Sequence, residues 1–334
     1  MKTERSCLSK RLTCIQHGYI LLRRAAILCL IWLSAMPAQA DQTLVCVLVP
    51  HFKDEYWLSV ANGVETEADL YGLQVRFFEA GGYRALQNQI DQLQQCKLLD
   101  PGAILIGAVS SDDPALLAAV AASARDVPVI GLVNELHSGA LSARIGVNWE
   151  DMGLQLGQYL AGLYPADGVP KQAILLSGPP EAGWVAPLER GLRRGLTGAG
   201  LQIAAVYGAD TGTGVQLRLL ESALAVDAAP DVIIGPAPAI EAAMALFARK
   251  SRRPVLAATY VSHSVARGLV GAQVIAAPFD DPMEQGSLAI TAAIVAMTGV
   301  TLSSLIGPNI RILTPKTDPA AIRLSPTTYF PALE

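Results

Sequence analysis

Short apolar runs alternate with longer amphipathic stretches from residue 44 to residue 315. The runs are rich in Val, Ile, Leu and Ala and are bounded by Gly, Pro, Asn or Asp, which is typical of buried strands. We therefore expect strands at residues 44–50, 75–80, 103–108, 128–134, 143–148, 173–178, 203–208, 231–236, 254–260, 274–279 and 310–315.

The stretches between these runs have helical spacing. Apolar residues recur every three or four positions from Trp57 to Ala68, and Gly72 ends the pattern. Further helices are predicted to begin at Pro114, after Asn148 and at 281–299. Strand–helix alternation with apolar strands predicts an α/β protein whose parallel sheets are covered on both faces.

The number of strands is large for one sheet, so we expect two doubly wound lobes joined by short crossing segments. The helix at 281–299 indicates that the chain returns to the first lobe late in the sequence. The predicted division is 41–147 plus 280–308 for the first lobe and 148–279 plus 309–334 for the second. Ligand crevices in such folds form at the carboxyl ends of the strands.

Residues 1–40 are predicted to be a signal peptide. Arg23 and Arg24 precede a short apolar run, and Ala38-Gln39-Ala40 is a small-x-small cleavage site. A membrane anchor is the alternative, but spanning a bilayer takes about 20 apolar residues. The absence of cysteine at the cleavage point argues against a lipoprotein, and we expect no membrane insertion after cleavage.

Charge and cysteine content refine this picture. Residues 1–40 hold six of the 25 basic residues and one of the 29 acidic ones, so the remainder has a net charge of −9. Such a surface repels phosphate backbones, which disfavours nucleic acid as a partner. Outside the leader only Cys46 and Cys96 remain. In an oxidising compartment such a pair favours a disulfide, with two buried free thiols as the alternative.

Aromatic residues make up only 6% of the chain, yet several fall just after predicted strands. The rings at these positions are Tyr56, Trp57, Tyr83, Trp149, Trp184 and Tyr260. If the carboxyl ends of the strands face one crevice, the rings meet there. Taken singly, Trp57 could be a core residue and Tyr83 an ordinary turn residue.

A cage of rings suits a trimethylated nitrogen, which has no N–H to donate and gains from several ring faces. Asp54 could balance its charge or act through water, or could simply cap the helix that begins there. A ligand oxygen would need a donor, for which a tyrosine hydroxyl, an indole N–H or a backbone N–H near Gly81-Gly82 are candidates.

Long blocks of the sequence resemble the type I periplasmic binding proteins, and among them those that bind trimethylamine N-oxide. The blocks are VPHFKDEYWLSVANG, EAGGY, QIDQLQQCK, PVIGLVN, IGVNWEDMG, SGPPEAG, TYVSHSVARGL and ILTPK. The resemblance implies a periplasmic protein with two Rossmann-like lobes and a three-segment hinge. It implies trimethylamine N-oxide as ligand and the periplasmic sensor domain of a TorS-like histidine kinase as partner.

The resemblance also implies residue roles. Trp57 and Tyr83 would offer ring faces from the first lobe, and Trp149 and Tyr260 from the second. Tyr56 belongs to the same aromatic motif as Trp57. Trp184 departs from the family pattern, in which glycine is expected. Cys46 and Cys96 match two family cysteines, which strengthens the disulfide prediction.

Catalysis has little support. His51, His137 and His263 show no metal-ligand spacing, and no nucleophile elbow or Walker loop is present. We expect no cofactor, no metal and no enzyme activity. The main alternative to a signalling protein is a substrate-binding protein of an ABC transporter for a sugar or quaternary amine, and a secreted enzyme on this fold is a third.

Overall fold

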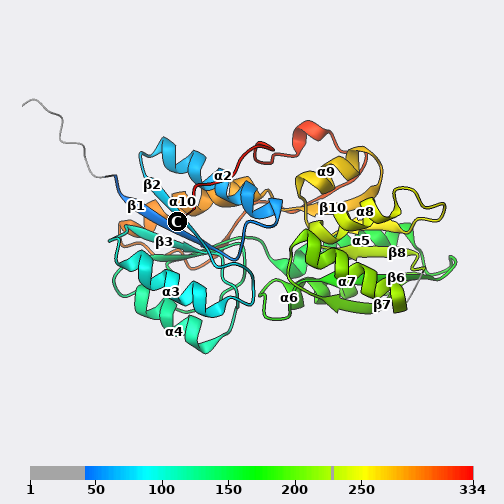
Figure 1. The fold of residues 1–334 in the computed structure, drawn as a ribbon, viewed down its shortest axis with the longest axis horizontal. Coiled ribbons are helices and arrows are strands. Elements are labelled where there is room, and N and C mark those ends of the chain that lie inside the picture. The colour runs from blue at the N-terminus through cyan, green and yellow to red at the C-terminus, as the bar shows by residue number, and fades with distance from the viewer. Residues whose placement is uncertain (1–41, 227–228, 334) are drawn as a thin grey trace, which may run out of the picture. The chain divides into compact units, whose positions relative to one another are not determined.

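The computed structural model describes residues 42–226 and 229–333 (Figure 1). The predicted signal peptide lies outside the described residues. Within them, the chain forms two sheets of six strands each.

The first sheet has the strand order β11-β5-β4-β3-β1-β2, and all its strand pairs are parallel. Helices α2 and α10 cover one face, and α3 and α4 cover the other (Figure 1). Its elements are β1 (Leu44–Val49), α2 (Glu55–Leu70), β2 (Gln74–Glu79), α3 (Leu86–Lys97), β3 (Ala103–Ile106), α4 (Pro114–Ser123), β4 (Val129–Leu132), β5 (Ala143–Ile145), α10 (Pro282–Met297) and β11 (Leu305–Ile306).

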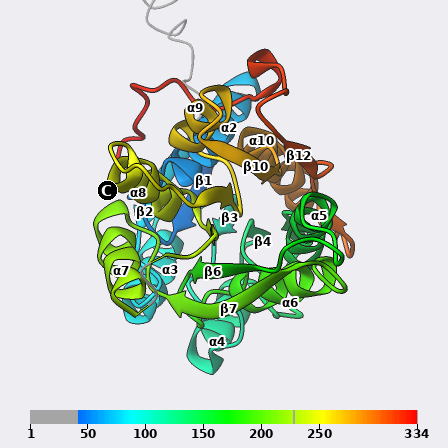
Figure 2. The ribbon, with the colours of Figure 1, turned by 90° about the vertical axis from the view of Figure 1, so that its right-hand side faces the viewer.

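The second sheet has the order β12-β10-β9-β8-β6-β7 and is parallel except for β12 against β10. Figure 2 shows α7 and α8 on one side of its strands and α5 and α6 on the other. Its elements are α5 (Trp149–Leu163), β6 (Lys171–Ser177), α6 (Val185–Gly195), β7 (Leu201–Gly208), α7 (Thr213–Val226), β8 (Val232–Gly235), α8 (Ala237–Phe247), β9 (Val255–Ala258), α9 (His263–Val270), β10 (Val274–Phe279) and β12 (Arg311–Leu313), followed by the short 3₁₀ helix η1 (Pro319–Ala321).

The central strands explain why the sequence folds this way. All residues of β3 and β4 are buried, as expected for strands with helices on both faces. The two helix-covered, mainly parallel sheets confirm the predicted doubly wound α/β class. The chain passes between the sheets three times, at residues 146–148, 280–281 and 307–310.

The last residues of the chain differ from the expectation. Residues 309–334 are predicted to lie in the second lobe, and β12 does pair with β10. Beyond it, however, the Ser325 N–H donates to Ser59 Oγ of α2 at 3.2 Å, and Leu333 forms a bridge with Phe77 of β2. Because β2 is an edge strand with unpaired backbone groups, it can accept this returning segment. The remaining lobe boundaries stay a proposal.

Two shorter differences concern strands. β11 was not predicted, because its two residues are too few to give an apolar run. β9 ends at Ala258, so Tyr260 lies in the loop beyond the strand. The other strands and the positions of the rings after them are close to those predicted from the sequence.

Candidate ligand-binding site

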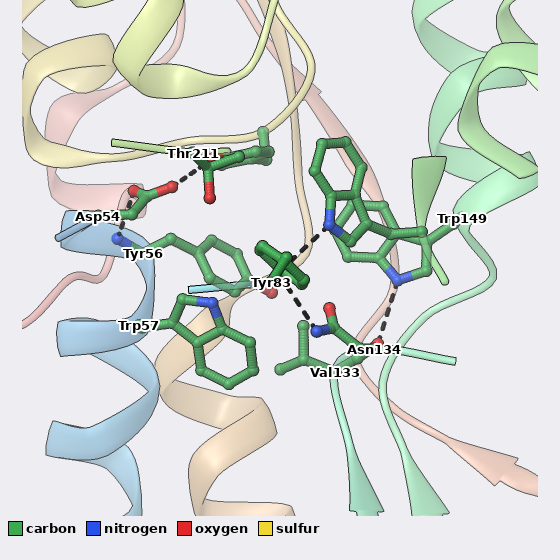
Figure 3. Close-up of a pocket in the computed structure, with 10 residues that line it drawn as sticks. Asp54, Tyr56, Trp57, Tyr83, Val133, Asn134, Trp149 and Thr211 are labelled. Carbon is green, nitrogen blue, oxygen red and sulfur yellow. Dashed lines mark hydrogen bonds between the residues drawn. The ribbon is translucent and has the colours of Figure 1, made fainter. Parts of the chain in front are cut away.

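A small cavity lies between the carboxyl ends of the two sheets (Figure 3). The free space inside it is small, so the site suits only a compact ligand. All six predicted rings and Asp54 line it, each only 3–5% exposed. The residues that line it are Asp54, Tyr56, Trp57, Tyr83, Val133, Asn134, Trp149, Trp184, Thr211 and Tyr260.

The first-lobe rings come from two strand ends. Tyr56 and Trp57 lie in the first turn of α2, just after β1. Tyr83 follows Gly81 and Gly82 after β2, and both glycines have positive φ values that favour glycine. Sharp turns of this kind bring the chain back across the sheet edge, so Tyr83 faces the rings of α2.

The second-lobe rings also come from strand ends. Trp149 begins α5, whose first turn is capped by Asn148, Trp184 immediately precedes α6, and Tyr260 follows β9. The Trp149 and Trp184 ring centroids are 5.7 Å apart, and those of Trp184 and Tyr260 are 6.3 Å apart. The cage closes across the lobes, because Tyr260 lies 5.2 Å from Tyr56.

Glycine contacts between helices hold the ring-bearing helices in place. A Cβ atom on Gly63 of α2 would overlap the carbonyl of Met283 in α10. In the second lobe, a Cβ atom on Gly191 of α6 would overlap the carbonyl of Glu150 in α5. Close packing of this kind fixes the position of each helix relative to its partner. It therefore also fixes the positions of Tyr56, Trp57 and Trp149 at the helix starts.

Asp54 caps a helix, which is one of the roles predicted for it, and also lies at the cavity. Its carboxylate caps α2 by accepting from the Tyr56 N–H at 3.1 Å, and it also lines the cavity. Its second oxygen accepts a hydrogen bond from the Tyr260 hydroxyl of the other lobe. Burial raises the pKa of Asp54 to about 6, against the lowering effect of these hydrogen bonds.

Tyr56 is anchored away from the cavity by its hydroxyl. The hydroxyl donates to Asp280 Oδ2 at 2.7 Å, and Gln285 Nε2 donates to the same carboxylate oxygen at 2.8 Å. Asp280 lies at the second crossing between the lobes, and burial raises its pKa to about 6. Tyr56 therefore offers a ring to the cavity and ties that ring to the hinge.

The Tyr83 hydroxyl accepts hydrogen bonds, whereas the Tyr56 hydroxyl donates one. Its hydroxyl oxygen accepts from Asn134 Nδ2 and from the Trp184 indole N–H, both at 3.2 Å (Figure 3). Burial raises the pKa of Tyr83 well above its ordinary value, even though these N–H groups favour the phenolate. Tyr83 is therefore a neutral phenol near neutral pH.

Three lining residues were missed from the sequence: Val133, Asn134 and Thr211. Val133 has φ +63°, which is strained for a β-branched residue, and the Asn134 N–H closes a three-residue turn onto the Leu132 carbonyl at 2.7 Å. The turn aims the Val133 carbonyl at the Trp149 indole N–H, 3.1 Å away. The position of Asn134 at the end of the strand predicted at 128–134 was a sign that it reaches the crevice, but Asn134 is not aromatic and was therefore not among the predicted rings.

The remaining histidines do not line the cavity. His51 is buried behind it, with Nε2 3.0 Å from Thr211 Oγ1 of the second lobe. His263 Nε2 lies 2.7 Å from the Ser325 carbonyl, and His137 is exposed beside Asp112. No group of side chains able to hold a metal ion occurs among residues 42–226 and 229–333.

Cys46 of β1 and Cys96 of α3 form a disulfide, as predicted. Both are fully buried, and the bond ties α3 to β1, the strand next to the sheet edge formed by β2. Among the described helices, none has the length and hydrophobicity needed to cross a membrane.

The two-lobed fold with a cavity at the hinge is that of a ligand-binding protein, and the comparisons agree. The model of the periplasmic binding protein domain matches residues 45–300. The chain belongs to the periplasmic binding protein family, whose members bind ligands.

The particular relatives are also informative. The periplasmic protein TorT of Escherichia coli O157:H7 is 37% identical over 285 residues, which cover 85% of this chain and 81% of TorT. Crystal structures of the TorS sensor domain–TorT complex, one without ligand and one in the presence of TMAO, each match with a TM-score of 0.77 and 32% identity. Each match covers 88% of this chain and 100% of the solved chain.

A transporter protein is similar to nearly the same degree. An ABC transporter solute-binding protein from Bradyrhizobium sp. BTAi1, solved with bound Bis-Tris, has a TM-score of 0.73 and 31% identity. The match covers 88% of this chain and 90% of that protein.

Proposed function

We propose that this protein binds trimethylamine N-oxide (TMAO) in the interlobe cavity and regulates the periplasmic sensor domain of a TorS-like histidine kinase. The carrying observation is the convergence of six rings from two lobes around one small cavity. The proposed ligand residues are Asp54, Tyr56, Trp57, Tyr83, Trp149, Trp184 and Tyr260. Binding is the output, without catalysis.

The chemistry of the cavity supports a methylated, zwitterionic ligand. Ring faces attract a methylated nitrogen by about 0.5–2 kcal/mol each, more when water is excluded. The Asp54 carboxylate, ionised above pH of about 6, adds a negative charge beside the cationic end. Ligand contacts from both lobes stabilise the arrangement in which the lobes meet, since a ligand shifts a population by its differential affinity.

The TorT comparison supports the signalling partner. TorT forms a complex with the TorS sensor domain in the solved structures, and this chain resembles TorT over most of its length. Transport is the second candidate, because the Bradyrhizobium solute-binding protein is similar to nearly the same degree.

Calorimetric titration of the purified protein tests the ligand. We expect binding of TMAO and no binding of ribose. Titrations with trimethylamine and glycine betaine measure how well the site discriminates among methylated amines. Ribose binding without a response to TMAO would overturn the proposal. Sedimentation of the protein with the purified sensor domain of the TorS-like kinase, with and without TMAO, tests the partner, and no complex in either condition would favour transport.

A further inference from the structure

We propose that Asn134 and Trp184 determine ligand specificity by forcing Tyr83 to donate its hydroxyl proton into the cavity. This inference rests on the proposed function and deepens it. It assigns the donor for the ligand oxygen, and it gives Asn134 and Trp184 a role through Tyr83 in addition to their place in the cavity wall.

The orientation of the Asn134 amide is fixed by a neighbour that can only accept. Asn134 Nδ2 lies 2.8 Å from the Ala108 carbonyl oxygen, and a carbonyl has no proton to give. The atom facing Ala108 must therefore be the NH₂ group. The same nitrogen lies 3.2 Å from the Tyr83 hydroxyl, so Asn134 donates to Tyr83 and cannot accept its proton there.

The second contact of Tyr83 has the same direction. An indole N–H is a donor only, and Trp184 Nε1 lies 3.2 Å from the Tyr83 hydroxyl. The phenolic oxygen thus accepts two hydrogen bonds. Its own proton has no acceptor among residues 42–226 and 229–333, and Tyr83 lines the cavity. The proton therefore points to the ligand.

The other donors of the cage are already engaged. The hydroxyls of Tyr56 and Tyr260 donate to carboxylates, and the Trp149 N–H donates to the Val133 carbonyl. The Trp57 indole N–H is a further donor directed at the Tyr83 hydroxyl. The cavity thus presents ring faces and one directed O–H group. An N-oxide satisfies that donor, whereas a methylated ammonium ion without an oxygen leaves it unpaired.

Closure of the lobes completes this donor arrangement. Asn134 and Tyr83 belong to the first lobe, whereas Trp184 precedes α6 of the second. A Cβ atom on Gly178 would overlap the Trp184 ring, so the glycine gives the indole its place. The Asn134 contact to Tyr83 exists within the first lobe, whereas the Trp184 contact forms only when the two lobes meet.

The test compares TMAO with tetramethylammonium, a probe of similar shape that has a methyl group in place of the oxygen. In Asn134→Asp, the new carboxylate accepts the Tyr83 proton and removes it from the cavity. The unsubstituted protein is expected to prefer TMAO. Asn134→Asp is expected to shift the ratio of the two dissociation constants toward tetramethylammonium by about tenfold or more.

A control variant and a second test variant accompany Asn134→Asp. Asn88→Asp makes the same change at an amide that also donates to a backbone carbonyl, that of Ala80, outside the cavity, and its ratio should not change. Trp184→Phe keeps a ring but removes the second donor to Tyr83, and its ratio should shift toward tetramethylammonium by about threefold or more. The Asn134→Asp carboxylate also attracts tetramethylammonium by its charge. The Trp184→Phe ratio, which involves no new charge, is therefore the decisive measurement.

The outcomes separate the two proposals. Failure of the unsubstituted protein to bind TMAO would remove the proposed ligand itself. Binding of TMAO by the unsubstituted protein, with an unchanged ratio in Trp184→Phe, would overturn only the role of Asn134 and Trp184.

Discussion

The Tyr260 hydroxyl donates a hydrogen bond to the Asp54 carboxylate and so joins the loop after β9 to the N-terminus of α2. The contact links a residue of one lobe to a residue of the other through two buried side chains. The contact therefore couples the ionisation of Asp54 to the contact between the two lobes.

Tyr260→Phe is expected to weaken TMAO binding about tenfold or more, because a hydrogen bond to a charged group contributes about 1.5–3 kcal/mol. Losing the donor also raises the pKa of Asp54 further, which reduces its negative charge near neutral pH. Titration calorimetry at pH 7 measures the affinity. Tyr329→Phe is the matched control, because its hydroxyl bonds to Glu65 outside the cavity. Equal affinities in the two variants would argue against the Asp54–Tyr260 link.

The free energy of unfolding is expected to carry a component that falls as pH rises from about 4 to 6. Asp54 and Asp280 have native pKa values of about 6 against 3.8 ordinarily, so the folded protein binds more protons in this window. Their contribution is complete below pH of about 4 and is lost as pH passes 6. Each group changes the slope by about 1.4 kcal/mol per pH unit.

Urea unfolding from pH 4 to 7 measures this component. Asp54→Asn should flatten the slope of the unfolding free energy against pH, because an amide does not titrate in this range. The neutral amide can still cap α2, so the helix should be retained. Asp126→Asn is the control, since Asp126 is exposed and its pKa is lowered by Lys97, which places its titration below the window. A parent and an Asp54→Asn variant with the same slope would contradict the raised pKa of Asp54.

Gly191→Ala is expected to lower the free energy of unfolding by about 1–3 kcal/mol through overpacking of α6 against α5. Because α5 carries Trp149 at its start, TMAO affinity should fall as well. Gly162→Ala on α5 is the control: no atom lies near its added Cβ, so it should raise stability by about 0.4–1 kcal/mol. Thermal unfolding and calorimetry of both variants provide the comparison, and a neutral Gly191→Ala would show that the helix pair can shift freely.

Removal of the disulfide by Cys46→Ala together with Cys96→Ala is expected to lower the free energy of unfolding by about 2–4 kcal/mol, since the bond closes a loop with a sequence separation of 50. TMAO affinity should change little, because neither cysteine lines the cavity. Urea unfolding of the variant and of the reduced parent gives the values. A large loss of affinity in a folded variant would show that α3 helps to shape the site.

The sequence by itself determined the class of fold. Apolar runs with helical stretches between them can bury both faces of a strand only in a helix-covered parallel sheet, and the strand ends then mark the ligand crevice. For that reason the sequence alone predicts that the six rings from Tyr56 to Tyr260 meet in one crevice. Cys46 and Cys96, the two cysteines outside the leader, likewise indicated a disulfide because an exported protein lies in an oxidising compartment.

Only the tertiary structure decided the polarity of the cavity. Whether Tyr83 donates or accepts depends on Ala108, Asn134 and Trp184, which come from distant parts of the chain and meet only after folding. The positive φ of Val133 and the return of residues 325–333 to β2 likewise have no periodic signal. Hydrophobic periodicity reports which face of an element is buried, whereas hydrogen-bond direction depends on the neighbour that each buried atom finally meets.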